Sequence, residues 1–94
     1  MQALLAQNRE AILETARRHG ALSIHLFGSV ARGDESAESD LDFLVRMEPG
    51  RSLVDMGALQ QDLQELLGCK VDVVSEGGLR PRFRERALRD AVAL

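Results

Sequence analysis

Two aspartates in the middle of the chain have the spacing of a metal-binding pair. Asp40 and Asp42 lie in the stretch SDLDFLV, where an apolar run with strand character begins. Residues two apart in a strand point to the same face, so both carboxylates would be directed at one spot. Like charges this close are costly to bury unless a cation neutralises them, and a hard divalent ion with oxygen ligands does so. The spacing therefore predicts a magnesium site.

A third aspartate occurs later in an apolar setting. Asp72 lies in KVDVVS, between Val71 and Val73, in a stretch that is typical of a fully buried strand. A lone buried carboxylate is expensive, so we expect Asp72 to join Asp40 and Asp42 at the same metal site.

A Gly-Ser pair upstream of these aspartates suggests an anion site. Gly28 lets the backbone approach a ligand closely, and a helical turn after Ser29 would point free amide groups at a phosphate. Arg32 could add a bidentate contact to the phosphates. A nucleoside triphosphate with its magnesium would fill both the anion and the cation site, and two such ions serve in-line displacement at phosphorus well.

Each piece also has a simpler interpretation. The aspartate pair could be solvated loop residues, Gly28 and Ser29 an ordinary turn, and Asp72 an edge-strand residue facing water. Arg32 could be a plain surface arginine. The combination, in this order along one short chain, favours the nucleotide site.

The elements that would position these residues can be read from hydrophobic periodicity. Helices are predicted from Ala3 to His19, with Gly20 as a left-handed stop, and from a capping box at Ser52 and Asp55 to Gly68. The second helix would bury Met56, Leu59, Leu63, Leu66 and Leu67. A last helix starting near Pro81 would turn Phe83, Ala87, Leu88 and Val92 inward.

Three strands alternate with these helices. They are predicted over residues 21–27, with Leu22, Ile24 and Leu26 on one face, then over residues 41–47 and 70–75. A short helical turn over residues 30–33 and an acidic loop over residues 34–40 separate the first two strands.

This order predicts an α/β (α+β) fold: a small mixed sheet of about three to four strands with helices packed on it, as one domain over residues 1–94. The second and third strands are joined through a helix and should be parallel in a right-handed crossover. The direction of the first strand stays open.

Composition narrows the classes of function. No apolar run approaches the length of a membrane span, the N-terminus lacks the layout of a secretory signal, and a single cysteine, Cys69, excludes an intrachain disulfide framework, so we expect a cytoplasmic protein without membrane contact. The absence of Trp and Tyr disfavours direct nucleic-acid binding. His25 is expected to be structural, and His19 to interact with the end of the first helix. The arginines of residues 80–89 form either a solvated face or a docking surface for an acidic partner, or for RNA held by such a partner.

The motifs GSVARG and SDLDFLV, with the later single aspartate in VDVV, resemble the minimal nucleotidyltransferases of the DNA polymerase beta superfamily. Within that family, the short chain resembles the antitoxin of a HEPN/MNT toxin-antitoxin pair. The resemblance implies that Gly28 and Ser29 hold the triphosphate, that Asp40 and Asp42 hold the metals, and that Asp72 ligates one metal and helps to deprotonate the acceptor. It further implies transfer of AMP from ATP to a hydroxyl, in the antitoxin branch a tyrosine of a HEPN ribonuclease-like toxin.

Two other functions remain open from the sequence. The chain could be a non-catalytic antitoxin that neutralises its partner by contact, or an α/β domain whose acidic site binds a metal for stability.

Overall fold

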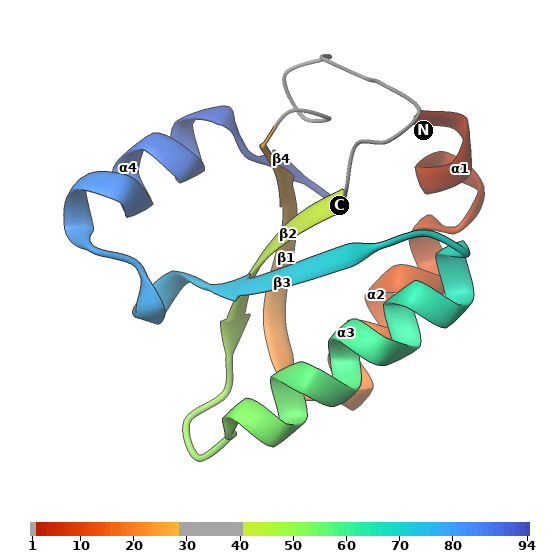
Figure 1. Cartoon of the computed structure of the whole chain (residues 1–94), viewed down its shortest axis with the longest axis horizontal. Helices are drawn as coiled ribbons and strands as arrows, with labels where there is room; N and C mark the ends of the chain where they lie inside the picture. Colours follow the sequence, from red (N-terminus) through yellow and green to blue (C-terminus); the bar gives the residue numbers. More distant parts are fainter. Residues whose placement is uncertain (1, 29–40) are drawn as a thin grey trace.

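The computed structural model describes residues 2–28 and 41–94, and in order along the chain it forms helices, strands and one 3₁₀ turn (Figure 1). These are α1 (Gln2–Gln7), α2 (Arg9–Arg18), β1 (Ala21–Phe27), β2 (Leu41–Met47), α3 (Leu53–Leu67), β3 (Val71–Ser75), the 3₁₀ turn η1 (Glu76–Gly78), α4 (Pro81–Asp90) and β4 (Val92–Ala93). The predicted helical turn and acidic loop over residues 30–40 lie outside the described residues.

The strands form one mixed sheet in the order β3-β2-β1-β4. The predicted parallel pairing of the second and third strands is confirmed, with α3 as the crossover helix. The first strand, whose direction the sequence left open, is antiparallel to β2, and β4 is antiparallel to β1. The mixed sheet of three to four strands with packed helices is therefore confirmed.

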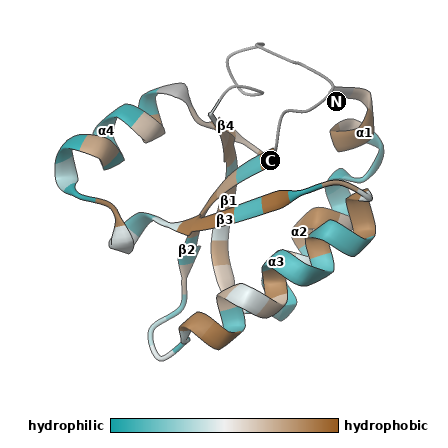
Figure 2. Cartoon of the chain, in the orientation of Figure 1, coloured by the Kyte–Doolittle hydropathy of each residue, from teal (hydrophilic) through white to brown (hydrophobic). Residues whose placement is uncertain are grey.

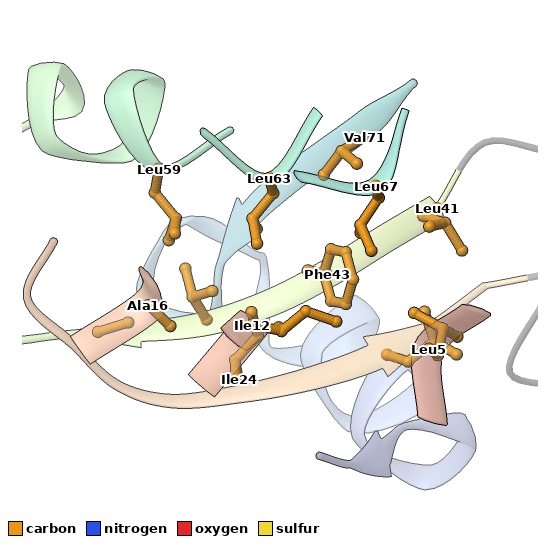
Figure 3. Close-up of a cluster of buried hydrophobic side chains, with 13 residues drawn as sticks. Leu5, Ile12, Ala16, Ile24, Leu41, Phe43, Leu59, Leu63, Leu67 and Val71 are labelled. Atoms are coloured by element: carbon orange, nitrogen blue, oxygen red, sulfur yellow. The ribbon is translucent and has the colours of Figure 1, made fainter. Parts of the chain in front are cut away.

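The core lies between one face of this sheet and helices α2 and α3 (Figure 3). Phe43 of β2 is fully buried at its centre, with Leu63 and Leu67 of α3 above it and Ile12 of α2 below it. In Figure 2 the apolar, brown segments recur along both helices between hydrophilic, teal ones. Because Phe43 faces the helices, Asp42 and Leu44 on either side of it point to the opposite face of the sheet.

The N-terminal helix differs from its prediction. A break at Asn8 divides it into α1 and α2, and at this break both the side-chain amide and the backbone amide of Asn8 donate to the carbonyl oxygen of Leu4, at 2.9 Å and 3.2 Å. The left-handed stop at Gly20 is confirmed, with φ of +87°. His19 is the C-cap residue of α2, and its Nε2 lies 2.6 Å from Asp62 Oδ2 of α3. This contact, which the sequence did not predict, ties α2 to α3.

The prediction that Leu22 lies on the inner face of β1 was also wrong. The register shifts between Ala21 and Ser23, so Ala21 is buried in the core while Leu22 is 57% exposed. A bulge of this kind moves one residue out of the alternation, and the sequence carries no clear sign of it. Ile24 and Leu26 are buried as predicted.

Helix α3 is fixed at both ends as the sequence predicts. The Ser52 hydroxyl accepts from the Val54 amide at 3.2 Å, the Asp55 carboxylate accepts from the Ser52 amide at 2.9 Å, and Gly68 ends the helix in the left-handed region. Of the expected inner stripe, only Leu66 lies outside it, exposed at the edge of the buried face.

Strand β3 is the edge of the sheet, so the prediction of a fully buried strand was wrong: only Val71 is buried, and residues 72–75 are half-buried. Two glutamines of α3 satisfy the outward amides of this edge. Gln64 Oε1 accepts from the Val71 amide at 3.2 Å, and Gln60 Oε1 accepts from the Val73 amide at 3.0 Å. These bonds fix β3 against α3 and close the edge to other strands.

Helix α4 also differs from its prediction. Phe83 and Leu88 are 56% and 40% exposed, and Ala87 is only half-buried. Val92 belongs to β4, where it pairs with Leu26 and is exposed. The amphipathic pattern of α4 predicted a buried face, but the described part of the chain provides little apolar surface for this helix to pack against.

Within residues 2–28 and 41–94, no helix is long and apolar enough to cross a membrane.

Candidate functional site

Two of the three predicted aspartates are neighbours on adjacent strands. Asp42 of β2 pairs in register with Asp72 of β3, so both side chains leave the same face of the sheet. Neighbouring strands are about 4.8 Å apart, which lets two carboxylates converge on one cation. Both residues are half-buried. The parallel crossover through α3 creates this pair, because it aligns the start of β3 with the start of β2.

Gly28 lies directly against Asp42. It follows Phe27, which pairs with Asp42 from the other side of β2, and it has φ of +82°. A Cβ built at this position would be 2.6 Å from Asp42 Oδ2. Any side chain here would displace the carboxylate, and the backbone conformation also favours glycine. Gly28, at the end of β1, is therefore adjacent to Asp42 of β2, which in turn pairs with Asp72 of β3.

The other predicted site residues, Ser29, Arg32 and Asp40, lie outside the described residues. They belong to the connection that begins at Gly28 and ends at Leu41, so both of its ends are at the site. Among the described residues, no group of three or more His, Cys, Asp or Glu side chains gathers as a metal site.

The donor set fits a hard divalent cation. Asp42 and Asp72 supply only oxygen ligands, from neighbouring strands and on one face, and this is the ligand chemistry of magnesium. Because Gly28 has no side chain, the Asp42 carboxylate can lie directly against the backbone at the end of β1.

His25 is a feature of this face that sequence reasoning assigned only a structural role. It lies two residues before Phe27 and pairs with Leu44, on the same face as Asp42. Its Nδ1 is buried and has no hydrogen-bond partner among residues 2–28 and 41–94. The alternation of β1 places His25 on this face, but only the structure shows that one of its nitrogens is unsatisfied.

A comparison with known protein families identifies the family of this chain. The model of the nucleotidyltransferase domain matches residues 9–94, which includes every described element from α2 to β4. The chain belongs to the nucleotidyltransferase domain family. The resemblance to minimal nucleotidyltransferases is thereby confirmed, and the protein is a nucleotidyltransferase enzyme.

Relatives and solved structures agree with this assignment. The chain is 35% identical to the protein adenylyltransferase MntA of Thermococcus cleftensis over 98% of each chain. It is 52% identical to a solved structure assigned as a minimal nucleotidyltransferase, with a TM-score of 0.88 over 96% of this chain and 92% of the other. A crystal structure of a toxin-antitoxin with AMP-PNP shares the fold, with 23% identity and a TM-score of 0.79 over 92% of this chain and 71% of the other.

Proposed function

We propose that this nucleotidyltransferase transfers AMP from ATP to a hydroxyl group of a partner protein. The acceptor is a tyrosine of a HEPN-type ribonuclease toxin, and the transfer makes the nucleotidyltransferase its antitoxin. The name of the Thermococcus cleftensis relative supports protein adenylylation. The toxin-antitoxin structure with AMP-PNP, similar in fold, supports both the class of partner and the class of nucleotide.

The observation that carries the proposal is the pairing of Asp42 with Asp72 against Gly28. In this proposal Asp42 and Asp72, together with Asp40, hold two magnesium ions. Gly28 and Ser29 bind the triphosphate, and the Arg32 guanidinium contacts its oxygens. When bound, magnesium neutralises the charge of the phosphate oxygens.

The reaction joins the acceptor oxygen to the α-phosphorus of ATP. The bond from that phosphorus to the oxygen bridging to the β-phosphate breaks, and pyrophosphate leaves with the bonding electrons. Asp72 takes the proton of the acceptor hydroxyl. A half-buried carboxylate near the start of a strand suits this role because it is held in place yet open to an incoming hydroxyl.

The test uses ATP labelled on the α-phosphate, with γ-labelled ATP as control, together with magnesium and a lysate of the source cells. We expect a protein band labelled only from the α position with the wild type and no band with Asp42→Asn. Glu65→Gln removes a carboxylate from the exposed surface of α3 and should label the band as the wild type does.

The same experiment separates the alternative of a non-catalytic antitoxin. If the wild type labels no protein, and Asp42→Asn still neutralises the toxin fully in cells, neutralisation occurs by contact and the proposed transfer is wrong.

A further inference from the structure

Helix α4 lies on the same face of the sheet as Asp42 and Asp72. Two connections join parallel strands: β2 to β3 through α3, and β3 to β4 through α4. They cross the sheet in opposite directions, so two right-handed crossovers place α3 and α4 on opposite faces. In Figure 3 the blue α4 accordingly lies on the other side of the strands from α3. Because the carboxylates point away from α3, they share their face with α4.

This helix is unusually exposed. None of its described side chains is buried, and its contacts within the described chain are chiefly with β1 (Figure 1). Its N-cap residue, Arg80, makes no side-chain capping bond. Isolated helices shorter than about 12–15 residues are marginal in water, and α4 has 10. Its formation would therefore be strengthened by a surface that covers it.

The chemistry of that surface follows from the side chains of α4. Arg82, Arg86 and Arg89 recur at helical spacing and form one stripe along the helix. Phe83 and Ala87 form the adjoining stripe, with Phe83 more than half exposed. No ion pair joins an arginine of α4 to an acidic side chain in the part of the chain that the structure describes.

Unpaired arginines around an exposed aromatic ring are the composition of a protein interface, with an apolar anchor inside a charged rim. A surface that complements this helix carries acidic groups around an apolar depression that receives Phe83. RNA would pair with the arginines but would leave the apolar stripe of Phe83 and Ala87 without an apolar surface to pack on.

We propose that α4 is the docking helix for the acceptor protein, which it binds through an acidic surface. This inference rests on the proposed transfer to a protein acceptor, and it adds the surface that holds the acceptor. Docking on α4 would put the acceptor on the face of Asp42 and Asp72, with its target hydroxyl free to approach them.

The test reverses charge on α4 and compares it with the same change elsewhere. The double variant Arg82→Glu with Arg86→Glu alters the exposed stripe of α4, and Arg17→Glu with Arg18→Glu makes the same change in net charge on exposed residues of α2. At low acceptor concentration and low salt, the α4 variant should label the acceptor about tenfold or more slowly, because electrostatic steering is lost. The α2 variant should stay near the wild-type rate, and all three proteins should bind ATP equally.

A fluorescent reporter measures docking itself. The chain has no Trp and no Tyr, so a Phe83→Trp variant carries a single tryptophan on α4. Addition of the purified acceptor should shift its emission to shorter wavelength as the ring is buried.

The outcomes are distinguishable. If the wild type labels the acceptor and the α4 double variant labels it equally fast, docking on α4 is wrong while the proposed function stands. If the wild type labels nothing, the proposed function fails, and the docking inference fails with it. If the defect of the α4 variant disappears after RNase treatment of the acceptor, RNA and not protein binds the helix.

Discussion

Helices α3 and α4 both connect parallel strands of the same sheet, yet they differ in almost every respect. Helix α3 is capped at both ends and buries Leu59, Leu63 and Leu67 in the core. Helix α4 has no side-chain cap and buries none of its described side chains. The contrast shows two uses of one crossover topology. Helix α3 packs on the face of the sheet opposite Asp42 and Asp72 and builds the core beneath their strands, whereas α4 presents charge on the same face as the two carboxylates.

The largest difference between the helices should appear in stability. Leu63→Ala leaves a cavity at a fully buried position of α3 and should lower the free energy of unfolding by about 2–5 kcal/mol. The same truncation at Leu88 of α4, which is 40% exposed, should cost less than about 1 kcal/mol because surface substitutions are nearly neutral. Urea denaturation of both variants measures this. Equal losses would show that α4 is packed as firmly as α3.

Loss of a hydrogen bond from a glutamine of α3 to strand β3 should cause the next largest decrease in the free energy of unfolding. Gln60→Leu leaves the Val73 amide without its acceptor and should cost about 1–3 kcal/mol, with faster hydrogen exchange at that amide. Gln61→Leu is the matched control, since Gln61 donates a hydrogen bond to Glu65 on the exposed side of α3. Similar exchange rates for Val73 in both variants would contradict the role assigned to Gln60.

A smaller effect is expected at the start of α3. Ser52→Ala removes the hydroxyl that accepts from the Val54 amide and should cost about 0.5–2 kcal/mol, the usual value of an N-cap. Arg80→Ala, at the uncapped start of α4, should change stability by less than half as much. Thermal denaturation of the two variants provides the comparison. A larger loss at Arg80 would reverse the contrast between the helices.

The smallest effect concerns pH. The amide of Ser52, followed by the Arg51 guanidinium, lowers the pKa of the Asp55 carboxyl below its ordinary value. A carboxyl with a lowered pKa in the folded state contributes stability above its unfolded pKa and loses it as pH falls through the folded pKa. In the Asp55→Asn variant, the free energy of unfolding should therefore fall slightly less steeply as the pH is lowered into the acid range. An unchanged steepness would mean that this carboxylate contributes nothing to the cap.

Much of the fold could be predicted because its signals are local. The capping box of Ser52 and Asp55, the stop at Gly68 and the periodicity of the α3 leucines each depend on a few neighbouring residues. The parallel pairing of the second and third strands followed from the helix between them. Asp42, Asp72 and Gly28 were predicted as site residues, and the register brings these three together.

The errors came from properties that depend on distant parts of the chain. The bulge that exposes Leu22 reflects how β1 meets β2, and the edge position of β3 depends on strand order. The amphipathic pattern of α4 indicates a helix but not what covers it, so Phe83 was placed inward by default. The unsatisfied Nδ1 of His25 is likewise a property of its surroundings.

The most direct test of the central claim asks whether Asp42 and Asp72 act as a unit. Transfer of α-labelled AMP to the acceptor is measured for Asp42→Asn, Asp72→Asn and the double variant under one set of conditions. If the two carboxylates hold the same reacting group, removing either one should slow the transfer by about 100-fold or more. The double variant should then be about as slow as the slower single variant. If the losses multiply, or if either single variant transfers at the wild-type rate, the two aspartates do not form one catalytic site.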